Sequence, residues 1–251
     1  MKSKIILTFD LEFWYNSKFL RKYYDKNNNK KDHPEIIIDK ILSFLSDNKC
    51  QATFFILGEL AEKYPESIKK IYQQGHEIAS HSYSHKYLDE LNEFEIDEEI
   101  RLSKKILENI IKQKITGYRA PSFSLNRKSW LVLEILKKNG FQYDSSIHPF
   151  KLLTFQNILP EIYTTLGGFY FRFLPLWLFI LLIKLLSRTK LPVIYFHPHE
   201  LFESSPQIKS ASWLKRKIKY FGTKKALIKF EKLLKRFNFI SIKQYLLDYY
   251  N

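Results

Sequence analysis

The sequence is poor in two residue types that many binding sites need. Its 251 residues include one cysteine, Cys50, and seven glycines. A single cysteine excludes an intrachain disulfide framework and a zinc site built from thiolates. No glycine-rich motif is present, which excludes a phosphate-binding loop of the Walker or dinucleotide type. Hydrophobic residues nevertheless make up 45% of the chain and aromatic residues 16%, enough to bury a core and to exclude a disordered chain.

A long apolar run is also absent. The most apolar stretch extends from Phe173 to Leu186, with Pro175 near its start and Lys184 near its end. It falls short of the ~20 residues that a membrane-spanning helix needs. We predict a buried helix here. A helix that lies at a membrane interface is the alternative, because Arg172 and Arg188 flank the stretch.

The first residues of the sequence do not resemble a signal peptide. A short apolar run ends at Asp10, and no small-residue cleavage site follows it. We therefore expect a cytoplasmic protein, with peripheral contact to the inner face of the membrane as a second interpretation.

Positive charge exceeds negative charge, since 41 Lys and Arg against 26 Asp and Glu give a net charge of +15. The lysines are spread along the chain and mixed with glutamates, which favours a solvated basic surface. Attraction to an anionic polymer or a membrane surface is the alternative, and we expect no nucleic-acid partner. The densest basic run lies within residues 215–225. The sequence carries no signal for an oligomeric state.

Strand-like and helix-like segments alternate along the chain. Strands are expected near residues 4–9, 51–57, 76–80, 115–119, 143, 192–196 and 239–242, and helices near 34–48, 59–74, 93–113, 127–139, 173–188 and 223–237. Such alternation indicates a parallel sheet with helical crossovers. No linker rich in Gly, Pro or Ser interrupts it. We predict an α/β fold, a distorted (β/α) barrel that forms a single domain over residues 1–251.

Polar residues occur where the expected strands end: Asp10, His81, Arg119, Asp144 and His197. In parallel barrels the catalytic groups collect at the carboxyl ends of the strands. We therefore expect these five side chains at one rim.

The pair His81 and His85 is the sharpest local feature. Two histidines four residues apart share a face if the segment turns helically. Imidazoles at that spacing suit a divalent transition-metal ion. Two surface histidines on a helix would give the same pattern.

Asp10 and Glu12 form a second feature, because residues two apart share a face in extended backbone. One carboxylate could complete a site of two histidines and one carboxylate, and the other could act as a base. Alternatively, they cap the next segment or pair with lysines.

His197 follows an apolar strand directly and could transfer protons near neutral pH, or it could be structural. Arg119 could hold a carboxylate through two hydrogen bonds. The sequence leaves His199 open between a structural role and a substrate contact.

Together these residues resemble the NodB-homology polysaccharide deacetylases, the family-four carbohydrate esterases, over residues 5 to about 245. Four segments carry the resemblance: Thr8-Phe9-Asp10, His81-Ser82-Tyr83-Ser84-His85, Arg119-Ala120-Pro121 and Phe196-His197. They match the start of the family's TFDDG motif, its H-[ST]-x-x-H motif, its R-x-P motif and its late strand followed by histidine. The variant pattern is most similar to a subgroup often linked to bacterial exopolysaccharide and surface-glycan loci.

The resemblance implies metal-assisted removal of N-acetyl groups from the amino sugars of a bacterial glycan or a lipid-linked glycan precursor. It implies that Asp10 is the base, that Arg119 orients Asp10, and that His197 is the acid. Asp144 would support His197.

The resemblance also implies a divalent metal, with Zn²⁺ as the expected ion. In the family a second aspartate follows the base directly and binds the metal. Leu11 stands there in this sequence and cannot bind a metal, so the expected ligands are Glu12, His81 and His85.

Residues beside the catalytic positions are candidates for substrate binding. Trp14, Tyr15 and Phe123 could stack on sugar rings, or they could pack in the core or the rim. Pro121 belongs to the R-x-P motif, and by resemblance the backbone N–H of Ser122 would stabilise the oxyanion.

Two other functions stay open at this point. Leu11 would also suit a related amidohydrolase, a deformylase or a cyclic-amide hydrolase that works without a metal. The positive charge and the Glu12 substitution would suit a glycan-binding protein that has lost catalysis.

Overall fold

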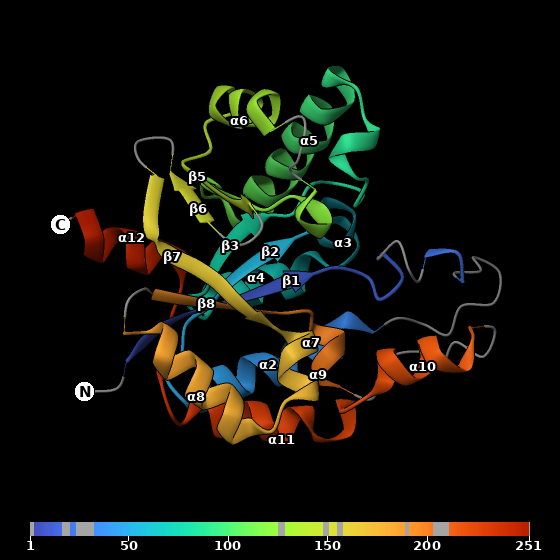
Figure 1. The fold of residues 1–251 in the computed structure, drawn as a ribbon. Coiled ribbons are helices and arrows are strands. Elements are labelled where there is room, and N and C mark those ends of the chain that lie inside the picture. The colour runs from blue at the N-terminus through green and yellow to red at the C-terminus, as the bar shows by residue number, and fades with distance from the viewer. Residues whose placement is uncertain are drawn as a thin grey trace.

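The computed structural model describes residues 3–16, 21–23, 33–124, 129–147, 151–154, 158–188, 191–202 and 211–250. Within these residues one curled sheet runs through the molecule, and helices lie above and below it in the view of Figure 1. The strands are β1 (Lys4–Leu11), β2 (Thr53–Ile56), β3 (Glu77–Ser80), β4 (Gly117–Tyr118), β5 (Tyr143–Ile147), β6 (Lys151–Thr154), β7 (Ile158–Gly167), β8 (Leu191–Phe196) and β9 (Asn238–Ile240).

The sheet closes on itself. Its order is β2-β3-β4-β5-β6-β7-β8-β1-β9, and β1 also pairs with β2. Only β6 runs antiparallel to its neighbours among the described strands. The carboxyl ends of the parallel strands therefore share one rim, at the right of Figure 1 where β1 ends. The predicted distorted (β/α) barrel in a single domain is confirmed.

Helices connect the strands. They are α2 (Pro34–Asp47), α3 (Gly58–Lys63), α4 (Pro65–Gln73), α5 (Glu93–Ile111), α6 (Ser129–Lys138), α7 (Gly168–Phe173), α8 (Leu176–Leu186), α9 (Pro198–Leu201), α10 (Trp213–Tyr220), α11 (Thr223–Leu234) and α12 (Ile242–Tyr250), with 3-10 turns at η1 (Leu88–Glu90) and η2 (Pro121–Phe123). No helix of the described residues combines the length and the apolarity that a membrane crossing requires.

The core forms where β1 passes between the two helical layers. From Ile5 onward every residue of β1 is buried, as expected for an apolar strand covered on both faces. The ring of Phe9 stacks on Phe54 at a centroid distance of 4.9 Å and meets Phe230 of α11 edge-on at 6.0 Å. This packing fixes the position of the rest of β1, including its polar end.

Prolines break two of the predicted helices. The segment expected as one helix over 59–74 is α3 and α4, which are separated at Pro65. The segment expected over 173–188 is α8, which begins only at Leu176 after Pro175, while Phe173 is the last residue of a separate helix, α7. The residue before a proline is pushed out of the helical region, and Tyr64 and Leu174 both have non-helical backbone angles.

The strands β6 and β7 and the helices α7, α9, α10 and α12 were not predicted from the sequence. β6 and α9 have four residues each and α7 has six, too few to show a period. β7, α10 and α12 have eight to ten residues and were missed despite their length. The start of the helix predicted over 127–139 lies outside the described residues, and the helix is described from Ser129 to Lys138.

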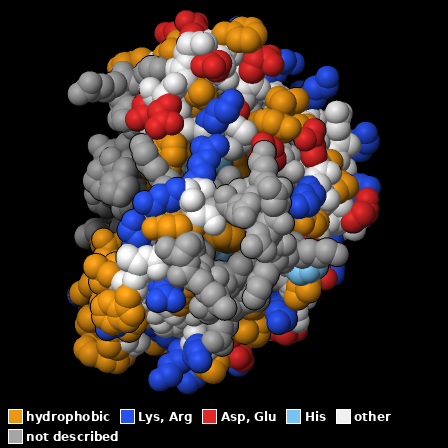
Figure 2. Space-filling model, turned by 90° about the vertical axis from the view of Figure 1, so that its right-hand side faces the viewer, with side chains coloured by type: hydrophobic (Ala, Val, Ile, Leu, Met, Phe, Trp, Pro, Cys, Tyr) orange, Lys and Arg blue, Asp and Glu red, His pale blue; other side chains and the backbone are white. Residues whose placement is uncertain are grey.

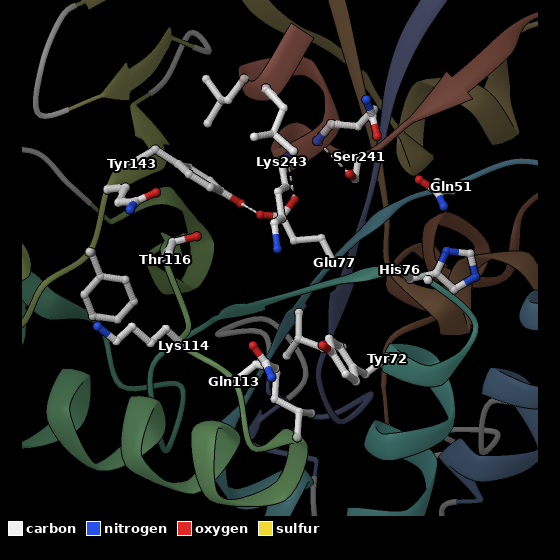
Figure 3. A pocket seen from close by; sticks show the side chains of 18 of the residues that line it. Gln51, Tyr72, His76, Glu77, Gln113, Lys114, Thr116, Tyr143, Ser241 and Lys243 are labelled. Atoms are coloured by element: carbon white, nitrogen blue, oxygen red, sulfur yellow. Dashed lines mark hydrogen bonds between the residues drawn. The ribbon is translucent and has the colours of Figure 1, made fainter. Parts of the chain in front are cut away.

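A cavity of about 1160 Å³ lies at the end of the barrel away from the rim and is lined by the starts of β3 and β5 and by α12 (Figure 3). Beside it the buried carboxylate of Glu77 joins three elements. It accepts hydrogen bonds from Oγ1 of Thr53 (2.6 Å), the hydroxyl of Tyr143 (2.8 Å) and the backbone N–H of Lys243 (2.8 Å). Burial raises the pKa of Glu77 above its ordinary value. The polar residues predicted for the active site do not line this cavity.

Candidate active site

The rim brings the three predicted metal ligands together. The candidate ligand atoms of Glu12, His81 and His85 all lie within 4.8 Å of one another, and all three residues are buried. Oε2 of Glu12 lies 2.5 Å from Nε2 of His85 and 4.0 Å from Nε2 of His81. Leu11 is buried in the hydrophobic core instead. The glutamate one position later therefore reaches the histidine pair.

The backbone fixes the ring of His81 in a form that can bind a cation. Nδ1 of His81 lies 2.8 Å from the carbonyl oxygen of Arg119. A carbonyl only accepts, so Nδ1 carries the proton and Nε2 presents its lone pair toward Glu12. Burial lowers the pKa of His81 to about 4.

The charge state of the cluster suits a divalent cation. Burial by itself would raise the pKa of Glu12, but the nearby His85 and His197 outweigh it and hold this pKa well below its usual range. A carboxylate and two imidazoles are a donor set that binds Zn²⁺ with a coordination position left for water or substrate. The residues present therefore fit the divalent metal that the resemblance implies.

The segment from His81 to His85 is a loop, and the helical turn considered for it is wrong. Ser82 and His85 have left-handed backbone angles, with φ of 67° and 59°. Glu99 of α5 holds the loop in this shape. Its carboxylate accepts hydrogen bonds from the backbone N–H groups of Tyr83 (3.1 Å) and Ser84 (2.8 Å) and from the hydroxyls of Ser82 and Ser84.

Asp10 and Arg119 form a buried ion pair beside the cluster. Nη1 of Arg119 donates to Oδ1 of Asp10 at 2.6 Å and to Oγ1 of Thr8 at 3.0 Å, and Nη2 donates to Oγ of Ser145 at 2.9 Å. The guanidinium also lies 4.0 Å from the ring centroid of Phe55. Residues of β1, β2 and β5 thus hold the guanidinium of Arg119 in place, and Arg119 in turn orients Asp10.

His197 is held by a carboxylate that the sequence reasoning missed. Nδ1 of His197 lies 3.1 Å from Oε2 of Glu200, and Oε1 of Glu200 lies 3.3 Å from Arg172. Nε2 of His197 lies 3.7 Å from Oε1 of Glu12 and so faces the cluster. Burial by itself would lower the pKa of His197, but Glu12 and Glu200 outweigh it and raise this pKa to about 10. Glu200 could have been found as the third residue of a helix that begins at Pro198, where a glutamate reaches back to the residue before the helix.

Asp144 does not support His197 as predicted, because Glu200 occupies that place. The carboxylate of Asp144 accepts hydrogen bonds from the backbone N–H and the hydroxyl of Ser146. Oγ of Ser146 in turn accepts the N–H of Ala120 at 2.7 Å. Asp144 therefore acts on the backbone that follows Arg119. Burial raises the pKa of Asp144 to about 6.

The comparison with known proteins agrees with this geometry. A family model described as polysaccharide deacetylase matches residues 2–143, more than half of the chain. The chain belongs to the polysaccharide deacetylase family. A second model, for a domain of unknown function called DUF3473, matches residues 141–247. In this deacetylase-family chain the two ranges share one sheet, since β8 and β9 both pair with β1.

Curated relatives match over part of their length. A peptidoglycan-N-acetylglucosamine deacetylase from Bacillus cereus is 41% identical over 93 residues, which are 37% of this chain and 32% of that protein. A peptidoglycan deacetylase from Helicobacter pylori is 28% identical over 113 residues, 45% of this chain and 38% of that protein. The aligned segments thus span about a third of these relatives. The predicted exopolysaccharide subgroup stays a prediction.

Solved structures of the family share the fold. A putative polysaccharide deacetylase from Mycobacterium smegmatis superposes with a TM-score of 0.64 at 19% identity, covering 97% of this chain and 88% of that chain. A CE4 family pseudoenzyme from Bacillus anthracis superposes with a TM-score of 0.56 at 17% identity, covering 97% of this chain and 65% of that chain. The same fold therefore occurs in a protein described as a pseudoenzyme, so the fold by itself does not establish activity.

The residues predicted to bind substrate surround the site at different depths. Trp14 and Pro121 are buried, Tyr15 and Phe123 are half-buried, and Ser122 is exposed. The ring of Phe123 lies 5.4 Å from the Arg119 guanidinium. Their contact with a sugar stays a prediction. His199 is half-buried with its ring centroid 5.4 Å from that of His197, and desolvation lowers its pKa to about 3.

Proposed function

We propose that this protein is a metal-dependent carbohydrate N-deacetylase that hydrolyses the acetamido group of an amino sugar in a bacterial glycan or a lipid-linked glycan precursor. One observation carries the proposal. The ligand cluster of Glu12, His81 and His85 lies beside a carboxylate held by an arginine and a histidine held by a carboxylate. Family membership supports the same reaction class.

The proposed cofactor is Zn²⁺, held by Glu12, His81 and His85. When bound, it would polarise the amide carbonyl and lower the pKa of water. The donor set, two imidazoles and one carboxylate, is typical of catalytic zinc sites. The contact of His81 with the Arg119 carbonyl would keep its metal-facing nitrogen unprotonated.

Asp10 would take the proton from the attacking water. Its partner Arg119 would hold the carboxylate in place, because the guanidinium is fixed in turn by Thr8 and Ser145. The water oxygen forms a bond to the carbonyl carbon, and the charge that develops on the carbonyl oxygen would be met by the backbone N–H of Ser122.

His197 would deliver a proton to the amine nitrogen as the carbon–nitrogen bond breaks. Glu200 accepts from Nδ1, so the other ring nitrogen faces the cluster and the reacting group. The products are acetate and the free amino sugar. A positioned base and a positioned acid each contribute about 10²–10⁴-fold to such a reaction.

Acetate release from acetylated chitooligosaccharides and peptidoglycan fragments tests the proposal. We expect turnover that a chelator abolishes and Zn²⁺ restores. We expect His81→Ala and Asp10→Asn to lose it, and the exposed His33→Ala to retain it. Turnover that neither the chelator nor His81→Ala reduces would favour a metal-free amidohydrolase. Glycan binding without turnover under any divalent metal would show a binding protein instead.

A further inference from the structure

Three helices in the second half of the chain expose several large apolar side chains each. We call α7, α8 and α10 the docking face. Its exposed residues include Phe173, Trp177, Leu181, Trp213, Leu214 and Phe221, the last directly after α10. Trp177 is 67% exposed and Trp213 is 65% exposed, and no residue of α10 is buried. Exposed apolar groups gathered in this way indicate a surface that binds a partner.

Helices α7 and α10 form one continuous surface, and α8 follows α7 directly in the chain. The ring of Phe173 lies 4.5 Å from that of Phe169 in α7 and stacks on Phe221 at 4.4 Å. Arg172 ties α7 to α10 from beneath, because its Nη1 donates to the carbonyl oxygens of Lys219 (2.7 Å) and Phe221 (3.1 Å). In α8, Trp177, Leu181 and Leu185 follow one another at four-residue spacing and share one side of the helix.

The charge of this face has one sign. Four of the eight residues of α10 are cations: Lys215, Arg216, Lys217 and Lys219. Lys217 is exposed and Lys215 and Arg216 are half-buried, whereas Nζ of Lys219 is buried against Trp14. Lys184 of α8 is exposed as well. Residues 168–188 and 211–225 contain no aspartate and no glutamate. Figure 2 shows hydrophobic side chains gathered together with Lys and Arg in the lower part of the face it presents.

The docking face is connected to the catalytic groups. Nζ of Lys219 in α10 lies 4.4 Å from the ring of Trp14, two residues after Glu12. Arg172 also contacts Glu200, which holds His197. A surface bound at α7 and α10 therefore lies next to the rim where the ligand cluster sits.

We propose that α7, α8 and α10 dock the protein on an anionic lipid bilayer, with their aromatic side chains in the headgroup region. Aromatic and aliphatic side chains flanked by Lys and Arg are the composition that binds at such an interface. The eleven residues of α8 extend about 16 Å, roughly half of the hydrocarbon core, so the helices lie on the bilayer. Docking requires no catalytic activity and is independent of the proposed function.

A second copy of the chain is the other candidate for this face, and the charges disfavour it. Two docking faces in contact would oppose cations with cations, and no carboxylate of these helices could neutralise them. Anionic headgroups supply the missing negative charge, at about a five-fold gain in affinity for each Lys or Arg near the surface.

Vesicle flotation of the full chain tests the proposal. We expect binding to phosphatidylcholine vesicles that contain phosphatidylglycerol, much weaker binding to phosphatidylcholine alone, and a decrease with salt. The double variant Lys215→Gln with Lys217→Gln should bind about twenty-five-fold more weakly. The matched double variant Lys137→Gln with Lys138→Gln, in the last turn of α6, should bind as the wild type does.

Tryptophan fluorescence with brominated phosphatidylglycerol vesicles locates the contact. Trp177→Phe and Trp213→Phe keep an aromatic ring and should retain binding, but each should lose part of the quenching. Trp130→Phe on α6, where the tryptophan is 82% exposed, should leave the quenching unchanged. Absence of vesicle binding, or quenching that disappears only with Trp130→Phe, would overturn the proposal. So would a dimer in sedimentation that Trp177→Ala dissociates while vesicles bind none of the proteins.

Discussion

At the scale of single residues, Glu12 shows how a carboxylate missing at one position can be supplied by the next residue. An aspartate directly after Asp10 would occupy the position of Leu11, which is buried in the core. Glu12 starts one residue later, just beyond the end of β1, and its longer side chain brings Oε2 to 2.5 Å from His85. The added methylene and the end of the strand together let Glu12 reach His85, because the backbone beyond Leu11 no longer follows the alternation of a β-strand.

Removing the charge of Glu12 should weaken the metal site and leave the fold intact. Substitutions in the outer shell of zinc sites cost about 10–100-fold in metal affinity, so Glu12→Gln at a direct ligand should cost at least about 100-fold. Titration of the protein with Zn²⁺ against a chromophoric chelator measures it. Glu66→Gln, at an exposed glutamate on α4, is the control. An unchanged Zn²⁺ affinity in Glu12→Gln would exclude Glu12 as a ligand.

His76 should make stability depend on pH. It is buried against Phe54, and burial lowers its pKa from 6.5 to about 4. Between these two values the unfolded chain binds more protons than the folded one at this residue. The contribution of His76 to the free energy of unfolding is therefore fully present above pH 6.5 and is lost as the pH falls toward 4.

In His76→Gln the loss of stability from pH 6.5 to 4 should be smaller than in the wild type by about 2 kcal/mol, a reduced value because the nearby cavity admits water. Urea unfolding at several pH values measures the difference. His33→Gln, at an exposed histidine, should follow the wild type. Parallel pH profiles of His76→Gln and the wild type would contradict this account.

At the scale of elements, α5 shapes the metal site without contacting the metal. Glu99 receives four donors from the loop between His81 and His85, and the left-handed Ser82 and His85 depend on that support. A loop held this way presents both histidines to one point, as a helical turn at the same spacing would.

Glu99→Ala should leave buried donors without a partner and release the loop. We expect a loss of about 2–3 kcal/mol in the free energy of unfolding and a 10–100-fold weaker Zn²⁺ affinity. Urea unfolding and Zn²⁺ titration measure the two effects. Glu98→Ala removes the neighbouring exposed carboxylate, which pairs with Arg101, and should change neither. Wild-type Zn²⁺ affinity in a folded Glu99→Ala protein would show that the loop holds its shape without this residue.

At the scale of the whole molecule, the two ends of the barrel carry different sets of buried polar side chains. The rim carries the ligand cluster and the two paired groups beside it. The opposite end is held by Glu77, which joins Tyr143 in β5 and the first turn of α12 (Figure 3). Glu77 also accepts a hydrogen bond from Thr53 in β2. We expect this hydrogen-bond network to contribute to the free energy of unfolding and not to the metal affinity.

Tyr143→Phe tests whether stability at one end of the barrel is independent of metal binding at the other. Removal of the hydroxyl leaves Oε1 of Glu77 without this donor and should cost about 1–2 kcal/mol in the free energy of unfolding. The Zn²⁺ affinity should stay at the wild-type value, since the cluster lies at the other end of the strands. Tyr249→Phe, at an exposed tyrosine of α12, is the control for stability. A weakened metal site in Tyr143→Phe would show that the two ends are coupled.

The sequence by itself determined the alternation of strands and helices, the barrel and the residues of the rim. Apolar runs that end in Asp10 or His197, and histidines at a fixed spacing, are local patterns that survive without coordinates. The tertiary structure decided which carboxylate meets which partner: Glu200 rather than Asp144 at His197, and Glu99 under the histidine loop. Such pairings join residues from different elements, and the strand register and helix packing that set them depend on contacts across the whole chain. For the same reason only the folded chain shows that α7 and α10 join in one basic, aromatic surface next to the catalytic groups.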